Sequence, residues 1–355
     1  MEETKNKVDF KSKMQKLWGL AFLIFLVIVY SIFGKGFFSY SSLQNILLAS
    51  SILLIIAIGE TFVMITGGID LSVAFTMGLS TVVAAMTMKA MNQMGINAVI
   101  IVIVGFVVGI IVCIIPGFLN GLIITKFGIP PIIVTLGMYL IARGVALLLS
   151  GGFPIGKQPS LLGKIGNGYL LYYLGSKGFF WGIPPVVAQD LKRYIIQIIP
   201  YPVIFLIIIL LLSHFILSRT KFGLYTYLIG GNVEAARRAG VNVNMHLTKI
   251  YILSSIFAGL AGMIYCFRYT SGTAIAGEAR LFDAIAAVVI GGASITGGYG
   301  KLIPGTLIGG LTIAVLQTGL VSMGVSTYYQ FLAVGIVIIL AVVIDKQIPL
   351  IYGKR

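Results

Sequence analysis

The strongest constraint on the fold is a series of long apolar segments that recurs along almost the whole chain. A helix needs about 20 mostly apolar residues to cross the hydrocarbon core of a bilayer. Each apolar segment of about that length is expected to form a transmembrane helix, and the segments cover residues 17–33, 43–66, 71–90, 97–124, 130–150, 200–218, 247–269, 281–296, 302–323 and 328–345. The sequence therefore predicts an all-α polytopic membrane protein with about ten transmembrane helices, organised as a single domain over residues 1–355.

Composition and charge agree with this class. Hydrophobic residues make up 58% of the chain and charged residues only 10%, which excludes an ordinary soluble domain. The net charge of +15 favours basic loops beside anionic lipid over a nucleic-acid partner, because the rest of the chain is so apolar. Cys113 and Cys266 lie inside apolar segments and are expected to be packing residues, and His214 and His246 have no metal-ligand spacing.

The distribution of basic residues predicts the orientation of the chain. The Lys-rich tail 1–16 is placed in the cytoplasm, and many spans follow it, so the first apolar segment is interpreted as a retained helix rather than a cleaved signal peptide. Ten spans then return the C-terminus to the cytoplasm. Residues 219–247 form an inner connection and residues 151–199 a long outer loop, which is either an interfacial linker or a docking surface for an external partner.

Two similar glycine pairs interrupt the apolar segments. They lie in "ITGGIDLS" (65–72) and "IGGASITGG" (290–298), which share the pattern G-G-x-[DS]-[IL]-[ST]. One interpretation is a turn followed by a capped helix, with Asp70 and Ser72 as caps; the other is a gate near a transport route. The similarity is compatible with an internal pseudo-repeat. The candidate route or gate residues in these stretches are Gly67, Gly68, Asp70, Ser72, Gly291, Gly292 and Ser294.

Few ionisable residues lie within the predicted spans, and they include Glu60, Arg143 and, near the membrane edge, Arg268. A charge in hydrocarbon is costly, so Glu60 should face the bundle interior or water. Glu60 either lines a polar route or reaches the cytoplasmic interface, and it joins the candidate route residues. A further charged group precedes the eighth span and consists of Glu278, Arg280 and Asp283. Catalytic motifs such as His-Glu-x-x-His and Gly-x-Ser-x-Gly are missing from the sequence, so a membrane enzyme is not favoured.

The stretch "GGNVEAARRAG" (230–240) places charge in the middle of an apolar chain. Gly230, Gly231 and Asn232 predict a turn, and "VEAARRAG" predicts a short helix that Gly240 ends. The acidic residue comes early and the basic residues late, an order that suits the helix dipole. This helix is either part of an ordinary amphipathic loop or a knob that docks into another protein. The residues concerned are Glu234, Ala235, Ala236, Arg237, Arg238 and Gly240.

"EAARRAG" resembles the EAA-x-x-x-G loop of permeases in ATP-binding-cassette (ABC) importers. Ile250 lies ten residues after Gly240, as in the longer family pattern, but Ile252 and Leu253 stand where that pattern has Leu-Pro. The blocks "TFVMITGGIDLSV" (61–73), "IGGNVEAARRAGVNV" (229–243) and "DAIAAVVIGGASITGGYGKLIPGTLIGG" (283–310) resemble the ribose, xylose and galactoside permease branch.

The resemblance implies a type II-like permease bundle in the bacterial plasma (inner) membrane. It implies two permease copies, usually identical, a solute-binding protein at the outer face and an ATPase at the inner loops. ATP and Mg would be bound by the ATPase, and this chain would bind no cofactor. Glu234, Ala235, Ala236 and Gly240 would carry the ATPase contact. The expected function is import of a monosaccharide or similar small polar solute by alternating access. The alternative, from the residues alone, is a stand-alone secondary transporter or channel, which would need an ion site.

Overall fold

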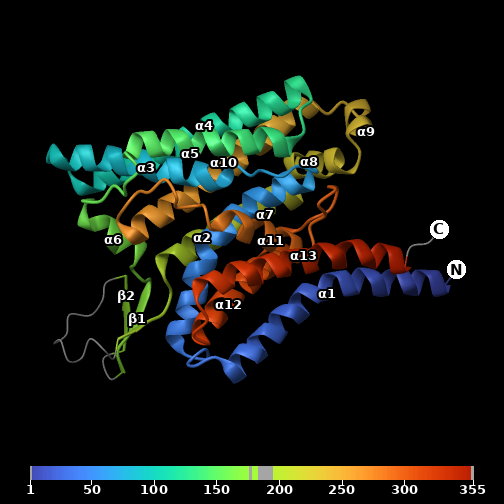
Figure 1. The fold of residues 1–355 in the computed structure, drawn as a ribbon, viewed down its shortest axis with the longest axis horizontal. Helices are drawn as coiled ribbons and strands as arrows, with labels where there is room; N and C mark the ends of the chain where they lie inside the picture. Colours follow the sequence, from blue (N-terminus) through green and yellow to red (C-terminus); the bar gives the residue numbers. More distant parts are fainter. Residues whose placement is uncertain (1, 176–177, 183–194, 353–355) are drawn as a thin grey trace.

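The computed structural model describes residues 2–175, 178–182 and 195–352 (Figure 1). Parts of the predicted outer loop, residues 176–177 and 183–194, lie outside the described residues, as do the ends of the chain at residues 1 and 353–355. The helices of the transmembrane bundle are α1 (Glu2–Phe33), α2 (Tyr40–Ile65), α3 (Val73–Gln93), α4 (Ala98–Phe127), α5 (Pro131–Ser150), α7 (Tyr201–Arg219), α10 (Val243–Tyr269), α11 (Arg280–Ile290), the π-helical turn η3 (Leu302–Thr306), α12 (Leu307–Ser322) and α13 (Thr327–Tyr352).

Seven helical segments are long and apolar enough to cross a membrane: α2, α3, α4, α5, α7, α10 and the segment that η3 and α12 form together. Two further helices, α1 and α13, contain the shorter apolar stretches Trp18–Phe33 and Tyr328–Val343. The chain is therefore a polytopic membrane protein, and seven of the ten predicted spans meet the length and composition of a full crossing within the described residues.

The predicted eighth span, 281–296, is much shorter than expected. It forms α11, whose 11 residues rise about 16 Å at 1.5 Å per residue, roughly half of the hydrocarbon core. The residues before it, 270–279, contain no helix and run against α3. A Cβ added at Gly272 would lie 2.2 Å from the Thr81 carbonyl oxygen, and one at Gly277 would lie 2.2 Å from that of Ala74. Irregular backbone is tolerated at membrane depth when protein covers it, and α3 provides that cover.

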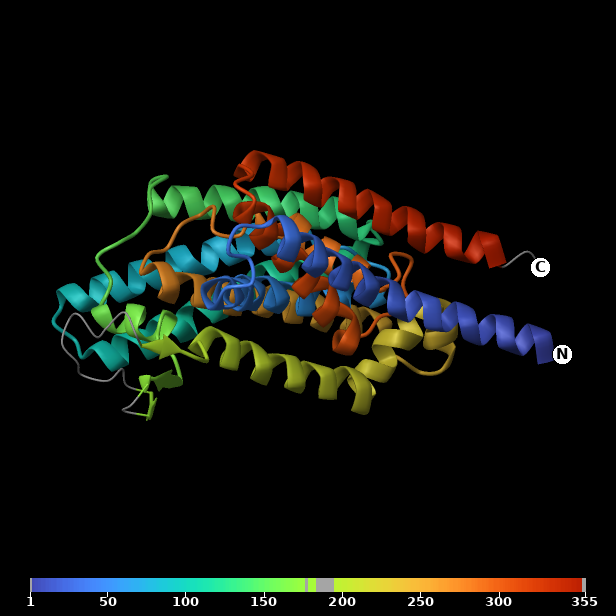
Figure 2. The ribbon, with the colours of Figure 1, turned by 90° about the horizontal axis from the view of Figure 1, so that it is seen from below.

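The bundle is built around α2 and α10. Almost all of the apolar window of α2 is buried, and its buried residues Leu53, Leu54, Ile55 and Ile56 belong to the largest hydrophobic cluster of the described residues. In Figure 1, α3, α4 and α5 lie along one side of this centre, and α1, α12 and α13 along the other. Figure 2, turned by 90°, places α13 and α7 on opposite flanks.

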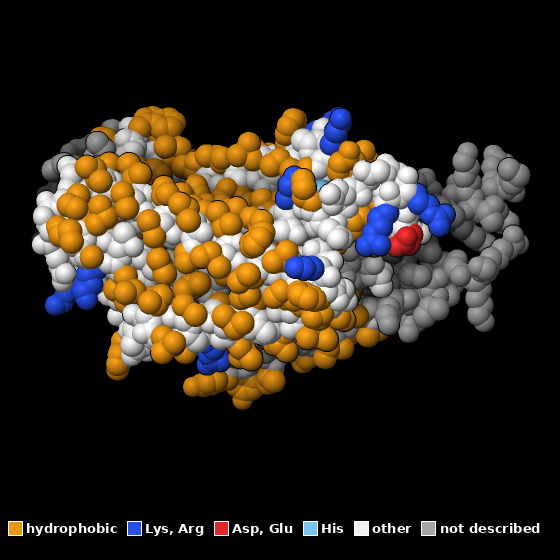
Figure 3. All heavy atoms as spheres, turned by 90° about the horizontal axis from the view of Figure 1, so that it is seen from above, with side chains coloured by type: hydrophobic (Ala, Val, Ile, Leu, Met, Phe, Trp, Pro, Cys, Tyr) orange, Lys and Arg blue, Asp and Glu red, His pale blue; other side chains and the backbone are white. Residues whose placement is uncertain are grey.

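The outer surface of the bundle is apolar between its two ends. Along α4, the exposed side chains of Ile100, Ile103, Val107 and Ile111 recur at helical spacing on one face. Figure 3 shows hydrophobic side chains spread over the face seen from above, with Lys and Arg side chains scattered among them. This surface suits contact with lipid tails.

The two ends of the molecule differ. One end carries both chain termini together with two short helices, α8 (Lys221–Gly231) and α9 (Val233–Arg238) (Figures 1 and 2). The other end carries α6 (Ser160–Gly166) and an antiparallel sheet in the order β2-β1-β3, built from β1 (Leu171–Tyr173), β2 (Phe179–Trp181) and β3 (Ile196–Gln197). The prediction of a purely helical chain missed this sheet, because its strands are only two or three residues long.

The sheet gives two aromatic side chains of the outer loop different environments. Trp181 is exposed on β2, where it is available to an interface, whereas Tyr172 is buried on β1. The Tyr172 hydroxyl accepts a hydrogen bond from the Tyr169 amide at 3.2 Å, so this side chain holds the loop together.

Candidate functional site

The short helix α9 forms at the predicted place. The Asn232 side chain caps it by accepting a hydrogen bond from the Ala235 amide at 2.9 Å, and Gly240, with φ of +81°, follows its last turn. The Val241 amide donates to the Ala236 carbonyl at 3.1 Å, which completes a Schellman motif. The prediction that Gly230 and Gly231 form a turn is wrong, because both lie in the last turn of α8 and only Asn232 leaves the helix.

One face of α9 is anchored and the rest is free. Ala236 is buried against Ile229, Val241 and Val243, whereas its neighbours along α9 are exposed. Arg237 and Glu234 form an ion pair at 3.2 Å, but both side chains lie in solvent, so the pair contributes little to stability. The helix therefore presents Glu234, Ala235, Arg237 and Arg238 outward on a fixed base.

Three glycine-containing segments meet at the end of α8, and we call their contact the glycine junction: residues 65–68, Gly230 and residues 297–298. The Gly298 amide donates to the Ile65 carbonyl at 2.8 Å. A Cβ added at Gly230 would lie 1.8 Å from the same carbonyl oxygen, and one at Gly297 would lie 2.9 Å from the Gly67 nitrogen. The junction thus brings the first glycine pair, Gly67 and Gly68, and the end of the loop that follows the second pair to the helix that precedes α9.

A tyrosine reinforces the glycine junction from α8. The Tyr227 hydroxyl donates to the Gly300 carbonyl at 2.6 Å. Burial raises the pKa of the Tyr227 phenol, and Tyr299 adds to the rise, so the hydroxyl keeps its proton and remains a donor. Nothing in the sequence pattern marked Tyr227, because its partner is a backbone atom 73 residues away.

The Gly-Gly pair after α2 is tied to a buried polar cluster. Asp70 is completely buried, and one of its carboxylate oxygens accepts from the Ser72 amide at 3.0 Å and from the Ser72 hydroxyl at 2.6 Å. The other oxygen accepts from the Ser254 hydroxyl of α10 at 2.9 Å. The Asn120 amide of α4 donates to the Ser72 hydroxyl oxygen at 2.9 Å. This cluster joins the turn to two neighbouring helices.

The capping role predicted for Ser72 is wrong. Its side chain makes no cap hydrogen bond to α3, since its hydroxyl is directed to Asp70. Asp70 accepts the Ser72 amide two residues on, as an Asx turn does, and in this way shapes the entry to α3.

Glu60 faces the bundle interior, as expected because a charged side chain in hydrocarbon costs free energy. It is completely buried on α2, and its carboxylate accepts from the Asp70 amide at 3.1 Å. Its helix neighbours Ala57 and Met64 are completely buried as well. In this conformation Glu60 supports the 66–72 turn through its hydrogen bond with the Asp70 amide.

The Gly-Gly pair after α11 has a different environment. Gly291 packs on η3, where an added Cβ would lie 2.6 Å from the Gly305 carbonyl. Gly292 has φ of +82°. The Ser294 hydroxyl lies 2.9 Å from that of Thr296, and its amide donates to the Tyr299 carbonyl at 2.9 Å. This loop is held mainly by backbone contacts.

The charged group before the eighth span divides in the structure. Glu278 is exposed, whereas Arg280 and Asp283 are connected by an ion pair at 3.4 Å. Gln317 of α12 completes the group: it accepts from Arg280 at 3.3 Å and donates to Asp283 at 2.8 Å. Gln317 was missed, although an amide in the middle of an apolar helix is a usable signal for an interior polar contact.

Two further polar residues singled out in the sequence, Arg143 and His246, have structural partners. The Arg143 guanidinium lies 5.1 Å from the centre of the Phe75 ring, a cation–π contact inside the bundle. His246 pairs with the Thr226 hydroxyl at 2.9 Å. Cys113 and Cys266 are free and buried, which confirms their prediction as packing residues. Within the described residues, no group of three or more His, Cys, Asp or Glu side chains is placed to hold a metal ion.

Comparison with known proteins gives a consistent result. The family described as branched-chain amino acid transport system / permease component matches residues 42–342. The ribose import permease protein RbsC of Bacillus subtilis is 36% identical over 348 residues, which cover 98% of this chain and 98% of that protein. The xylose transport system permease protein XylH of Haemophilus influenzae is 32% identical over 377 residues (95% and 98%), and the fructose import permease protein FrcC of Rhizobium meliloti is 34% identical over 317 residues (89% and 81%). No solved structure matches the chain.

Proposed function

Because the chain belongs to the branched-chain amino acid transport system / permease component family, we propose that it is the membrane-spanning subunit of an ABC importer that carries a monosaccharide. Its similarity to ribose, xylose and fructose permeases, which extends over at least 81% of each protein, is the observation that carries the proposal. The chain is a transport subunit and not an enzyme. Its partners are an ATPase subunit and a solute-binding protein, and ATP and Mg are bound by the ATPase rather than by this chain.

In this proposal α9 is the docking element for the ATPase. Its exposed residues Glu234, Ala235, Arg237 and Arg238 stand on a base that Ala236 anchors, so a push on α9 moves its base instead of bending a loop. Gly240 allows the sharp exit from the helix with its positive φ. The small Ala235 side chain leaves space for a partner surface to approach the backbone.

The glycine junction would carry this push to the gate. Gly230 contacts both the turn after α2 and Gly298 in the loop after α11, so a displacement of α8 reaches the first Gly-Gly pair and the loop that follows the second. Gly67, Gly68, Gly291, Gly292 and Ser294 form the moving parts. Glu60, Asp70 and Ser72 form the support that returns the first turn to its place.

We propose that the sugar passes between two identical copies of the chain. The centre of a single bundle is filled, since α2 is buried along almost its whole apolar window. A route along the α11 side needs no opening of that core. On that side, the segment 270–290, which is helical only from Arg280 onward, exposes Phe282. Its ring offers an aromatic face on which a sugar ring can stack, and the hydrogen-bonded group of Arg280, Asp283 and Gln317 offers polar contacts nearby.

The protein is a multi-pass protein of the bacterial inner membrane, and we propose that both termini lie in the cytoplasm. They lie at the end of the bundle that carries α9, where the ATPase must bind (Figure 1). A stand-alone transporter or channel is not favoured, because the relatives are components of import systems.

The proposal is tested by reconstituting the chain in proteoliposomes with its ATPase and solute-binding protein and measuring uptake of radiolabelled ribose, xylose and fructose. Uptake of one of these sugars that requires both ATP and the solute-binding protein is the expected result. Transport by the chain alone, driven by an ion gradient, would contradict it.

The docking role of α9 has its own variant. Ala235→Trp enlarges an exposed side chain, so insertion and folding should be preserved while co-purification of the ATPase and ATP-driven uptake fall at least tenfold. The matched control is Met94→Trp just after the end of α3, where the native side chain is also highly exposed. An equal loss of ATPase co-purification and of uptake in both variants would contradict the docking role of α9.

A further inference from the structure

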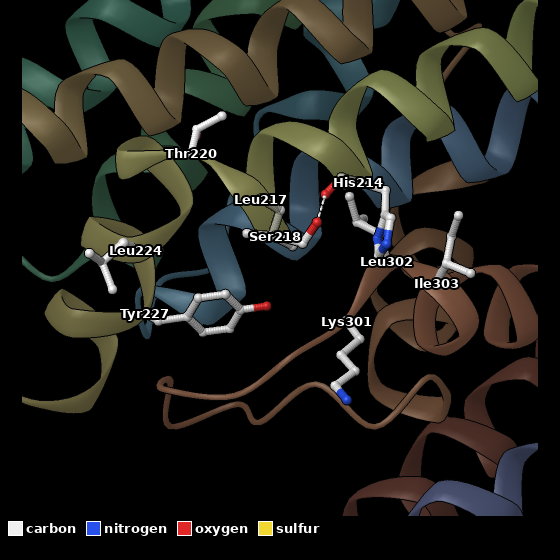
Figure 4. Close-up of a pocket in the computed structure, with 9 residues that line it drawn as sticks. All are labelled: His214, Leu217, Ser218, Thr220, Leu224, Tyr227, Lys301, Leu302 and Ile303. Atoms are coloured by element: carbon white, nitrogen blue, oxygen red, sulfur yellow. Dashed lines mark hydrogen bonds between the residues drawn. The ribbon is translucent and has the colours of Figure 1, made fainter.

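A pocket lies beside α8, outside the gate and the docking helix. Its volume is about 390 Å³, and it is bounded by the end of α7, the beginning of α8 and the segment 301–303. Figure 4 shows its lining side chains, among them the polar residues His214, Ser218, Tyr227 and Lys301. Neither His214 nor Lys301 has a part in the gate or in the docking of α9.

The pocket combines cationic donors with apolar walls. None of its lining residues is acidic. Within the described part of the chain, the Lys301 ammonium forms no ion pair and the His214 ring has no hydrogen-bond partner, whereas the Ser218 and Tyr227 hydroxyls donate to the carbonyls of His214 and Gly300. The groups left to receive a ligand are therefore the donors of Lys301 and His214. Such a set favours an anion.

The surroundings indicate where that anion comes from. The pocket opens at the end of α7, whose exposed side chains Ile208, Leu211, Leu212 and Phe215 form an apolar face suited to lipid tails. Arg219 and Lys221 follow at once, where this face ends and α8 begins. Leu217, Leu224, Leu302 and Ile303 line the pocket itself. A free phosphate ion would leave these apolar walls unused, but a phospholipid would cover them with the upper part of an acyl chain.

We propose that this pocket binds the phosphate headgroup of an anionic phospholipid, with Lys301 and His214 as the donors and the leucine walls against the acyl chain. Basic pockets between transmembrane helices are suited to such headgroups, because the leaflet on the cytoplasmic side is rich in anionic lipid. The site rests on the proposed cytoplasmic location of this end of the chain and not on the identity of the transported sugar.

The lipid would also affect the glycine junction. Tyr227 belongs to the pocket wall and holds Gly300, and Lys301 follows directly in the chain. A lipid that bridges α8 and the 301–303 segment favours the conformation in which both are in contact.

The test is native mass spectrometry of the full-length chain purified in mild detergent, titrated with phosphatidylglycerol or with phosphatidylcholine. The wild-type chain should retain phosphatidylglycerol in preference to phosphatidylcholine. Lys301→Gln should weaken the binding about fivefold, and adding His214→Gln should weaken it further. Leu224→Trp, which fills the pocket from α8 without changing charge, should also displace the lipid.

The matched control is Lys126→Gln, which removes an exposed basic side chain from the last turn of α4 at the same end of the molecule. This variant should bind phosphatidylglycerol like the wild type. Equal binding by Lys301→Gln and the wild type would overturn the proposal, and so would full displacement of the lipid by millimolar inorganic phosphate. Thermal unfolding of each variant without lipid shows that the fold is preserved.

Discussion

The two Gly-Gly turns look alike in sequence and end their helices in the same way. After α2, the Gly67 amide donates to the Met64 carbonyl and the Gly68 amide to the Val63 carbonyl; after α11, Gly292 and Ala293 donate to Val289 and Val288. Both are Schellman motifs. However, the glycine with positive φ is the first of its pair in one turn (Gly67) and the second in the other (Gly292). When the two turns are aligned by sequence, the residues with equivalent backbone conformation are therefore offset by one position.

The segments after the two turns differ more than the turns themselves. The first turn leads to Asp70, which is completely buried and accepts three hydrogen bonds from Ser72 and Ser254. The second leads to Ser294 and Thr296, which bond to each other near the surface. One turn is therefore anchored in the bundle, and the other is a loop whose position depends on the glycine junction and Tyr227. We infer that the second turn is the one that moves more easily.

The largest expected effect comes from removing the anchor of the first turn. Asp70→Ala leaves the donors of Ser72 and Ser254 buried without an acceptor, at a cost of about 1–3 kcal/mol each, so little folded protein should remain. Ser294→Ala, at the corresponding place in the second turn, should change stability by about 0.5 kcal/mol or less. The measurement is the thermal midpoint of the detergent-solubilised chain, followed by size-exclusion chromatography.

Asp70→Asn separates acceptor loss from charge loss in this experiment. The Asn oxygen still accepts from Ser72, so the thermal midpoint should recover most of the way toward the wild type. A midpoint for Asp70→Ala close to that of Ser294→Ala would show that the two turns are equally anchored, and the proposed difference in their mobility would be wrong.

The next effect concerns the contact of α8 with the first turn and with the end of the loop that follows the second turn. Gly230→Ala places a Cβ where only 1.8 Å separates it from the Ile65 carbonyl oxygen, so the backbone of the glycine junction must move, at about 1–3 kcal/mol. ATP-driven uptake should fall at least tenfold. Gly231→Ala is the adjacent control, because its Cβ meets nothing within 4 Å and the alanine favours the helix by about 0.5–1 kcal/mol. Equal uptake by both variants would argue against the junction as the transmitting contact.

Much of this fold could be predicted because helices that cross a membrane need long apolar segments, and these are visible in the sequence. Apolar length marked α2, α3, α4, α5, α7 and α10, and the charge order with Gly240 marked α9. The family could be identified from the blocks around Gly67, Glu234 and Gly291, which agrees with the family match over residues 42–342.

The rest depended on contacts between distant residues. Apolar length placed the end of the eighth span at residue 296, whereas α11 ends at Ile290, because Ala and Gly suit a close-packed helix as well as a buried turn. Gly230 and Gly231 suggested a turn, yet α8 uses Gly230 for close approach to Ile65. The hydrogen-bond partners of the Asp70–Ser72 pair lie on α4 and α10, and no local sequence pattern predicts them.

A smaller effect tests the geometry that the two turns share. Gly67→Ala and Gly292→Ala each force a Cβ into a left-handed conformation, with φ of +81° and +82°, at about 1–2 kcal/mol. The two thermal midpoints should fall by similar amounts, since both positions are the same place in a Schellman motif. Asn at either position should cost less than Ala, because Asn tolerates this conformation better. A much larger loss at one position would mean that the caps are not equivalent.

The smallest expected change separates stability from coupling. Tyr227→Phe removes the hydrogen bond to the Gly300 carbonyl at a cost of about 1 kcal/mol, so the chain should still fold and insert. If the second turn is held mainly through α8, its freedom should rise, and the reconstituted importer should hydrolyse more ATP per sugar molecule transported. The control is Tyr225→Phe on the same helix, since the Tyr225 hydroxyl forms no hydrogen bond within the described part of the chain and should leave that ratio unchanged. If Tyr227→Phe leaves the ratio of ATP hydrolysed to sugar transported unchanged, the second turn is held by the glycine contacts alone.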